Sequence, residues 1–309
     1  MGHNLLIDRF SGIGRTRKTR STMTAPLRTA EHEPDPSEIL TPETVGEYVD
    51  GIAAFLGGAA NVIMQLSLRP VGRGVLESTV DSGKVTLHPI KRLRTTLTYI
   101  AVALLGSDAE REAYRAAVNV SHRSVRSTAA SPVKYNAFDP NLQLWVAACL
   151  YWGIDDLYTR MHGPMDAATA EAFYSYAARL GTTLQMRPEM WPADRAEFQR
   201  YWDENLKQRG IEPELREYFN GLIDLKMMPR PVQVVFAGLQ RFVVTGLLPQ
   251  HLRDEMGMTW TDRDQQRLDR LLRAIGAVHR RLPAAARMFP LNAYLFDLRR
   301  RLRRGKPLV

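Results

Sequence analysis

The chain has 309 residues, of which 45% are hydrophobic and 24% are charged. A chain of this length and balance can bury a core, which excludes an intrinsically disordered, collagen-like or multi-span membrane protein. Its formal net charge of +9 would by itself suggest nucleic acid or an acidic membrane as a partner.

The positive charge is concentrated in two terminal segments. Residues 1–28 carry six basic groups and one acidic group, and residues 298–309 carry six basic groups and no acidic group. Residues 29–297 hold 30 basic and 32 acidic groups, so the body of the chain is close to neutral. We therefore do not expect nucleic acid as a partner, whereas the two basic segments favour a peripheral contact with an anionic membrane.

Cysteine usage and hydropathy favour a cytoplasmic protein. Cys149 is the only cysteine, which excludes an intrachain disulfide and a paired-cysteine metal site. The first residues lack the apolar stretch of a secretory signal, and the longest uncharged run, residues 51–68, is interrupted by Gly, Asn, Gln and Ser. We therefore expect neither a signal peptide nor a transmembrane segment.

The chain divides into three segments. Residues 1–43 are rich in Ser, Thr, Pro and charge over most of their length, which predicts a mobile arm. Residues 44–297 have helical spacing of apolar residues and no hairpin signal, which predicts one all-α domain, and residues 298–309 form a basic tail. The expected helices are 44–67, 90–105, 108–127, 141–160, 167–180, 194–206, 213–221, 231–245 and 262–281.

Local signals fix two helix starts and a central layer. The sequence Ser107-Asp108-Ala109-Glu110 is a capping box, and Asp139-Pro140 places a capping carboxylate before a proline of the first turn. The segments 52–66, 95–105 and 142–154 are apolar on nearly every face. We expect these three helices to be surrounded by the others.

One histidine stands out by its position. On a helix, His122 shares a stripe with Tyr114, Val118 and Val125, so its imidazole should point inward. A lone inward histidine is commonly a hydrogen-bonded core residue. The functional alternative is an axial ligand of haem iron, for which Arg126 and the arginines at the start of helix 90–105 could supply cations near the propionates.

The other histidines carry no such pattern. His3 and His32 fall in the predicted arm, and His88 and His162 are expected to be exposed, next to Pro89 and before Gly163-Pro164. His279 lies at the edge of an apolar stripe and is expected to be a boundary residue. No HExxH, HxH or ExxH spacing occurs in the body, which leaves a non-haem iron or zinc centre without a motif.

Seven short segments of the body, taken in order, form a recognisable pattern. They are Gly57–Leu66, Gly74–Glu77, Arg92–Leu97 with Gly106, Val120–Arg126, Tyr135–Val146, Tyr201–Glu204 and Leu247–Pro249. Over about residues 45–290 this pattern resembles the MpaB-type oxygenase family, whose relatives include the latex-clearing rubber oxygenases.

The resemblance implies an all-α fold with a globin-like core and a b-type haem whose iron is bound by His122. It also implies that Arg92 and Thr96, four residues apart on one helix face, shape the distal side of the haem. Thr95 stands where rubber oxygenases can place a distal lysine, so an open or water-filled sixth iron position follows. Glu77 matches a family glutamate that could act as a base or as a salt-bridge partner.

Together with this resemblance, the sequence predicts a haem b-dependent oxygenase that uses dioxygen and acts on an apolar, isoprenoid- or lipid-like substrate, with Arg126 near a propionate and an electron donor as a further partner. Many relatives have histidine where this chain has Leu68, Ser78 and Ala147. This difference keeps open a haem-binding or sensing protein without turnover. A third alternative is a helical module that docks on anionic membrane through its basic segments.

Overall fold

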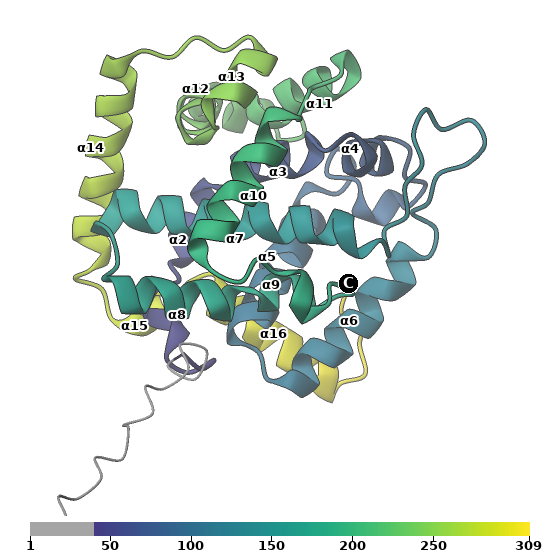
Figure 1. Ribbon diagram of the computed structural model, residues 1–309, viewed down its shortest axis with the longest axis horizontal. Coiled ribbons are helices and arrows are strands. Elements are labelled where there is room, and N and C mark those ends of the chain that lie inside the picture. The colour runs from purple at the N-terminus through teal and green to yellow at the C-terminus, as the bar shows by residue number, and fades with distance from the viewer. Residues whose placement is uncertain (1–39) are drawn as a thin grey trace, which may run out of the picture. The chain divides into compact units, whose positions relative to one another are not determined.

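The computed structural model describes residues 40–309 (Figure 1). Within that range the chain is helical and forms no β-strand, apart from a single antiparallel bridge between Arg126 and Asn136. This confirms the all-α fold, whereas the globin-like arrangement stays a prediction. The predicted arm, residues 1–43, lies outside the described residues except for its last four.

The fold is a series of α-helices with three short 3₁₀ turns among the described residues. These turns are η1 (Val45–Glu47), η2 (Asp81–Gly83) and η3 (Pro188–Met190). In chain order the α-helices are α2 (Gly51–Leu56), α3 (Gly58–Leu66), α4 (Arg69–Leu76), α5 (Pro89–Leu105), α6 (Asp108–His122), α7 (Pro140–His162), α8 (Ala167–Ala177), α9 (Arg179–Thr182), α10 (Arg195–Lys207), α11 (Pro213–Ile223), α12 (Arg230–Leu247), α13 (Gln250–Met256), α14 (Asp262–His279), α15 (Ala284–Arg287) and α16 (Leu291–Arg303).

Three predicted helices are shorter than expected, and one of them, 167–180, is divided at Ala178 into α8 and α9. The segment 44–67 breaks at Gly57, which ends α2 and begins α3 and lies against the side chain of Leu157. The segment 108–127 ends at His122, because the chain then turns back and the Val125 carbonyl accepts a hydrogen bond from the Ala137 amide at 3.0 Å. His122 therefore stands at the C-terminus of α6, where a loop begins.

The segment predicted as a basic tail begins inside a helix. Leu291, Leu295 and Leu298 form the buried face of α16, which packs against α5. Arg299 pairs with Glu110 of α6, with 2.6 Å between Nε and Oε1. Helical structure thus continues to Arg303, and part of the positive charge of this segment is used in contacts with the body.

The predicted central layer is confirmed for α7 and for the second half of α5, whereas the segment 52–66 reaches the surface at Phe55, which is 55% exposed. Helix α7 crosses the middle of Figure 1, and α14 packs across one of its ends. Trp145 of α7 is 1% exposed and donates a hydrogen bond from its indole to the Met64 carbonyl of α3 at 3.1 Å. The second half of α5, from Leu97 to Leu105, is buried except at Tyr99. No helix among residues 40–309 combines the length and apolarity needed to span a bilayer.

Two glycines allow backbones to meet directly. A Cβ atom on Gly276 of α14 would overlap the Met161 carbonyl at the end of α7, and one on Gly51 of α2 would overlap the Phe289 carbonyl. Backbone atoms cannot move aside as a flexible side chain can. These glycines therefore set how closely α14 approaches α7 and how closely α2 approaches the segment after α15.

The packing at Gly276 predicts that Gly276→Ala lowers the free energy of unfolding by about 2–3 kcal/mol, because the new methyl group forces α14 away from α7. Gly58→Ala is the matched control, since a Cβ atom there meets nothing within 4 Å, and it should be neutral or stabilising by about 0.5 kcal/mol. Urea unfolding followed by circular dichroism measures both. Equal stability of the two variants would contradict the assigned packing.

Candidate functional site

His122 is the last residue of α6, and its side chain is largely covered. The capping box predicted at Ser107 is present and fixes the start of this helix. Tyr114, two turns before His122, is buried and donates its hydroxyl to the Thr95 carbonyl of α5 at 2.8 Å. This hydrogen bond ties α6 to α5 and sets the position of the imidazole beside the start of α5.

The His122 ring has an unsatisfied polar atom. Its Nδ1 is buried and has no hydrogen-bond partner among the described residues. The ring of Phe138 meets the imidazole at a right angle, with 6.2 Å between centroids. A buried polar atom without a partner is rare in native proteins, because leaving it unpaired costs about 1–3 kcal/mol. The arrangement is therefore that of an imidazole with a nitrogen available to a ligand.

Electrostatics keep this imidazole neutral. Burial, and after it the positive charge of Arg92, lower the pKa of His122 from 6.5 to about 4. Both effects disfavour the imidazolium form. At neutral pH the ring therefore carries a lone pair, as a metal ligand must.

Arg92, Thr95 and Thr96 lie on the first turns of α5. The Arg92 side chain is exposed, yet close enough to lower the pKa of His122. The Thr95 hydroxyl donates a hydrogen bond to the Arg92 carbonyl at 3.0 Å, so this hydroxyl is already paired within the helix. The structure thus brings Arg92 and His122 together, and Thr96 follows one turn after Arg92.

Glu77 anchors the loop that follows His122. Its Oε2 accepts hydrogen bonds from the hydroxyls of Ser131, at 2.5 Å, and Tyr135, at 3.0 Å. These contacts hold the loop of residues 123–139 against the end of α4. The carboxylate therefore has a clear positioning function for the loop that carries Phe138.

Arg126 lies in the same loop, where its backbone pairs with Asn136. Its side chain is exposed, and no ion pair joins it to another residue in the part of the chain described by the structure. Arg92 is in the same situation. Two free guanidinium groups, one on α5 and one on the loop after α6, thus lie on elements adjacent to His122.

A second cluster, which the sequence did not indicate, contains Asp50, His162 and His279. Asp50 contacts His162 through Nε2 and Oδ2, and its Oδ1 lies 3.1 Å from Nδ1 of His279. The expectation of an exposed His162 is wrong, since its side chain is 10% exposed, and His279 is buried at 6% rather than lying at a boundary. The reason is that α14 docks on the end of α7 at Gly276 and brings His279 beside His162, with 6.2 Å between the ring centroids.

Comparison with known proteins places the chain in a family. The curated proteins that it resembles include the uncharacterized protein Mb2261 of Mycobacterium bovis and the uncharacterized protein Rv2237 of Mycobacterium tuberculosis. Each is 47% identical over 251 residues, which is 81% of this chain and 98% of the relative. No solved structure matches the chain.

The family profile described as "ER-bound oxygenase mpaB/B′/rubber oxygenase, catalytic domain" matches residues 46–277. This range runs from η1 to the last turn of α14 and includes His122, the start of α5 and the loop anchored by Glu77. The chain therefore belongs to the family of mpaB and rubber oxygenase catalytic domains.

Proposed function

We propose that this protein is a haem b-dependent oxygenase that uses dioxygen and acts on an apolar, isoprenoid- or lipid-like substrate. Membership of an oxygenase family supports the reaction class. The observation that carries the haem assignment is the largely buried, neutral imidazole of His122 with an unpartnered ring nitrogen. An axial haem ligand needs a neutral imidazole with a free lone pair.

The residues around His122 fit such a group. Bound haem would supply an iron centre able to bind and activate dioxygen. His122 would bind the iron, and the guanidinium groups of Arg92 and Arg126, which form no ion pair within residues 40–309, offer partners for the haem carboxylates. Thr96 shares a face of α5 with Arg92 and would help to shape the space around the bound group.

The start of α5 also exposes apolar surface. Ile90 is 66% exposed and Leu93 is 36% exposed, on either side of Arg92. Contact of such side chains with water is unfavourable. Covering them with an apolar ring or substrate stabilises the complex by about 25 cal/mol per Å² of apolar surface buried. These residues therefore favour an apolar ligand over a small polar one.

The proposed ligation predicts that His122→Gly abolishes haem binding. The purified protein should show a Soret band, the variant should lose it, and imidazole added to the variant should restore part of it by occupying the vacated space. His88→Ala, at an exposed histidine, is the matched control and should keep the band. Circular dichroism checks that both variants remain folded.

Turnover is tested on the same preparations by dioxygen uptake with isoprenoid oligomers and unsaturated lipids. Uptake that depends on His122 and falls about tenfold or more in Arg92→Ala supports an oxygenase, since Arg92 would act in the transition state. Stable haem without uptake favours the binding or sensing alternative. A Soret band that survives His122→Gly contradicts the ligand assignment.

The low pKa of His122 predicts a pH-dependent stability of the haem-free protein. Between pH 6.5 and about 4 the unfolded chain protonates this imidazole and the folded chain does not, so the free energy of unfolding decreases as the pH falls through this window. The His122 imidazole accounts for about 3 kcal/mol of this decrease in the free energy of unfolding. Urea unfolding across this range should show a shallower pH dependence in His122→Gln, and identical slopes would contradict the prediction.

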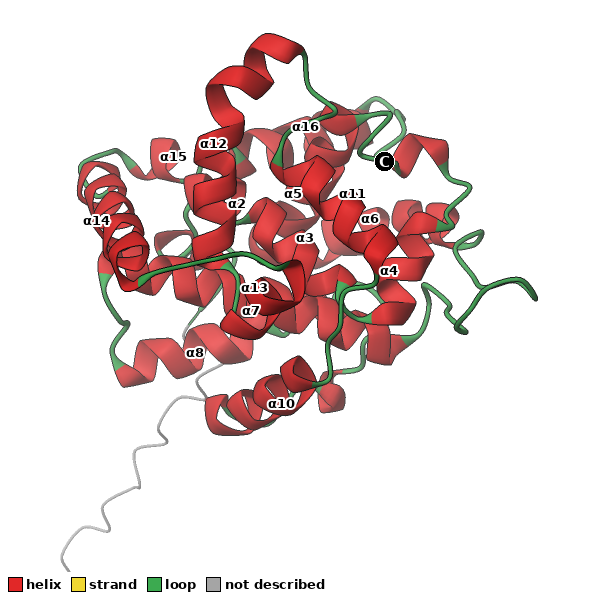
Figure 2. Cartoon of the chain, turned by 90° about the horizontal axis from the view of Figure 1, so that it is seen from above, coloured by secondary structure: helices red, strands yellow, loops and turns green. Residues whose placement is uncertain are grey.

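We further propose a peripheral contact with anionic membrane, made by the first half of α12. Val234, Val235, Phe236 and Leu239 are 81%, 66%, 51% and 53% exposed. Figure 2 shows this end of α12 projecting beyond neighbouring helices. Arg230 is exposed at the same end, and apolar side chains beside basic ones are typical of a helix that lies in a membrane interface.

The membrane proposal predicts that Val235→Ser/Phe236→Ser weakens binding to vesicles of phosphatidylcholine and phosphatidylserine by about tenfold. Phe55→Ser on α2 removes an aromatic ring with a similar exposure of 55% and serves as the control. Co-sedimentation measures the bound fraction. Undiminished binding, or a dimer in size-exclusion chromatography that only the double variant disrupts, would contradict a lipid partner.

A further inference from the structure

Asp50, His162 and His279 come from three segments that are far apart in the sequence. Asp50 directly precedes α2, His162 ends α7 and His279 ends α14. Their side chains are 6%, 10% and 6% exposed, and one potential ligand atom from each residue lies within 4.8 Å of the other two. Two imidazoles and a carboxylate thus converge in a nearly dry location outside the proposed haem site.

The Asp50 carboxylate is not used to cap its helix. Asp50 occupies the N-cap position of α2, where an aspartate ordinarily accepts a hydrogen bond from the first turn, but its side chain makes no such bond. Both of its oxygens are directed at histidines instead. Gly51 has no side chain, so the start of α2 can pack directly against the Phe289 backbone. This packing fixes the position of Asp50 beside the two histidines.

The hydrogen bonding of His279 leaves a gap that a cation would fill. Its Nε2 lies 3.2 Å from the Arg287 carbonyl oxygen, which can only accept, so Nε2 carries a proton. Its Nδ1 lies 3.1 Å from Oδ1 of Asp50 but has no aligned hydrogen bond. In the neutral ring, a lone pair on Nδ1 would face the carboxylate oxygen, and a positive charge between them, either a proton or a metal ion, would remove that repulsion.

We propose that Asp50, His162 and His279 bind a divalent transition metal ion of the zinc class. Two imidazole nitrogens and one carboxylate oxygen form a ligand set typical of Zn²⁺ and of non-haem Fe²⁺. The Arg287 carbonyl would then act as the outer partner that fixes the His279 tautomer, an arrangement common around metal-bound histidines. Such an ion would join the start of α2 to the ends of α7 and α14.

Arg280 competes with the ion for His162. One guanidinium nitrogen of Arg280 lies 3.3 Å from Nδ1 of His162 and also 3.3 Å from the Met161 carbonyl. Metal binding through Nε2 places the proton of His162 on Nδ1, so Arg280 must turn to the carbonyl or to water. Because Arg280 is exposed, this movement requires no repacking of the core.

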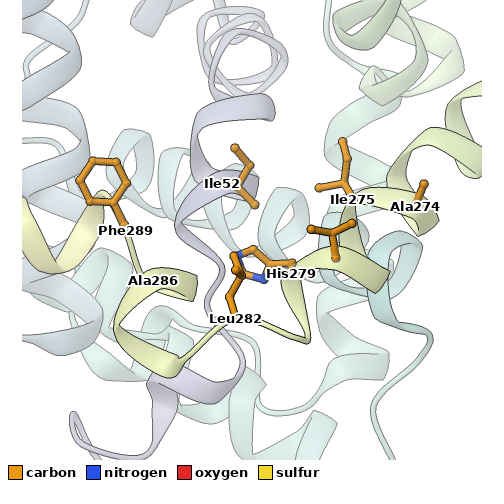
Figure 3. Close-up of a pocket in the computed structure, with 8 residues that line it drawn as sticks. Ile52, Ala274, Ile275, His279, Leu282, Ala286 and Phe289 are labelled. Carbon is orange, nitrogen blue, oxygen red and sulfur yellow. The ribbon is translucent and has the colours of Figure 1, made fainter.

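A groove adjoins the cluster. His279 contributes to its lining, together with Ile52 of α2, Ile275 of α14 and Phe289, and the groove has a volume of about 490 Å³. Figure 3 shows His279 between α2 and the turn from α14 to α15. Three protein ligands leave a coordination position for water, and the groove gives an apolar molecule access to His279.

The test is equilibrium dialysis of the full chain, stripped by a chelator, against Zn²⁺, with the bound metal measured by mass spectrometry. We expect one ion per chain at micromolar or lower free Zn²⁺, and a higher melting temperature with the ion bound. Asp50→Asn and His279→Gln should each weaken binding by about tenfold or more. His88→Gln, at an exposed histidine, controls for adventitious surface binding and should change nothing.

Arg280→Gln distinguishes a metal site from a hydrogen-bonded cluster even if the ligand variants fold poorly. Removing the competing guanidinium should tighten Zn²⁺ binding about tenfold, because it removes a positive charge beside the ion. Absence of Zn²⁺ binding to the parent chain, or binding that Arg280→Gln and the ligand variants leave unchanged, would overturn the proposal. The cluster would then be an imidazolium–carboxylate pair.

Discussion

Both candidate sites depend on the burial of α7, the 23-residue helix that runs through the centre of the fold. Its first turn is capped by Asp139, which accepts a hydrogen bond from the Asn141 amide at 2.8 Å, and this start fixes Phe138 against the His122 ring. Its last residue is His162 of the second cluster. At about 1.5 Å per residue the helix separates the two sites by roughly 30 Å. They can therefore hold different groups without sharing ligands.

The α7 helix can hold the two sites in place because its side chains pack closely against several neighbouring helices. Trp145 stacks on Trp202 of α10 with 5.3 Å between ring centroids, and Trp152 stacks on the same residue at 5.0 Å. Large rings in contact leave little freedom for the helix to slide. At the far end, Gly276 lets α14 dock directly on the Met161 carbonyl, so the end of α7 is held on both sides.

Sequence reasoning predicted what local patterns encode. The capping residues Ser107 and Asp139 give the starts of α6 and α7, and the stripe that includes Tyr114 and Val118 brings His122 inward. It could not find the second cluster, because His162 and His279 each stand at a helix end that looks exposed in its own local sequence. Both histidines are buried by the contact between α7 and α14, which lie more than a hundred residues apart in the sequence. Gly276 makes this contact possible, because it has no side chain to keep the two backbones apart.

The two proposals differ in the form of metal because the charges around the two sites differ. His122 has the positive Arg92 beside it, and the Glu77 carboxylate is engaged in hydrogen bonds with Ser131 and Tyr135. A bare divalent cation there would meet repulsion without compensation. A haem brings its own anionic ring nitrogens and propionates, for which free arginines are an advantage. Asp50 supplies its negative charge directly between two imidazoles, which is the environment that a bare cation requires.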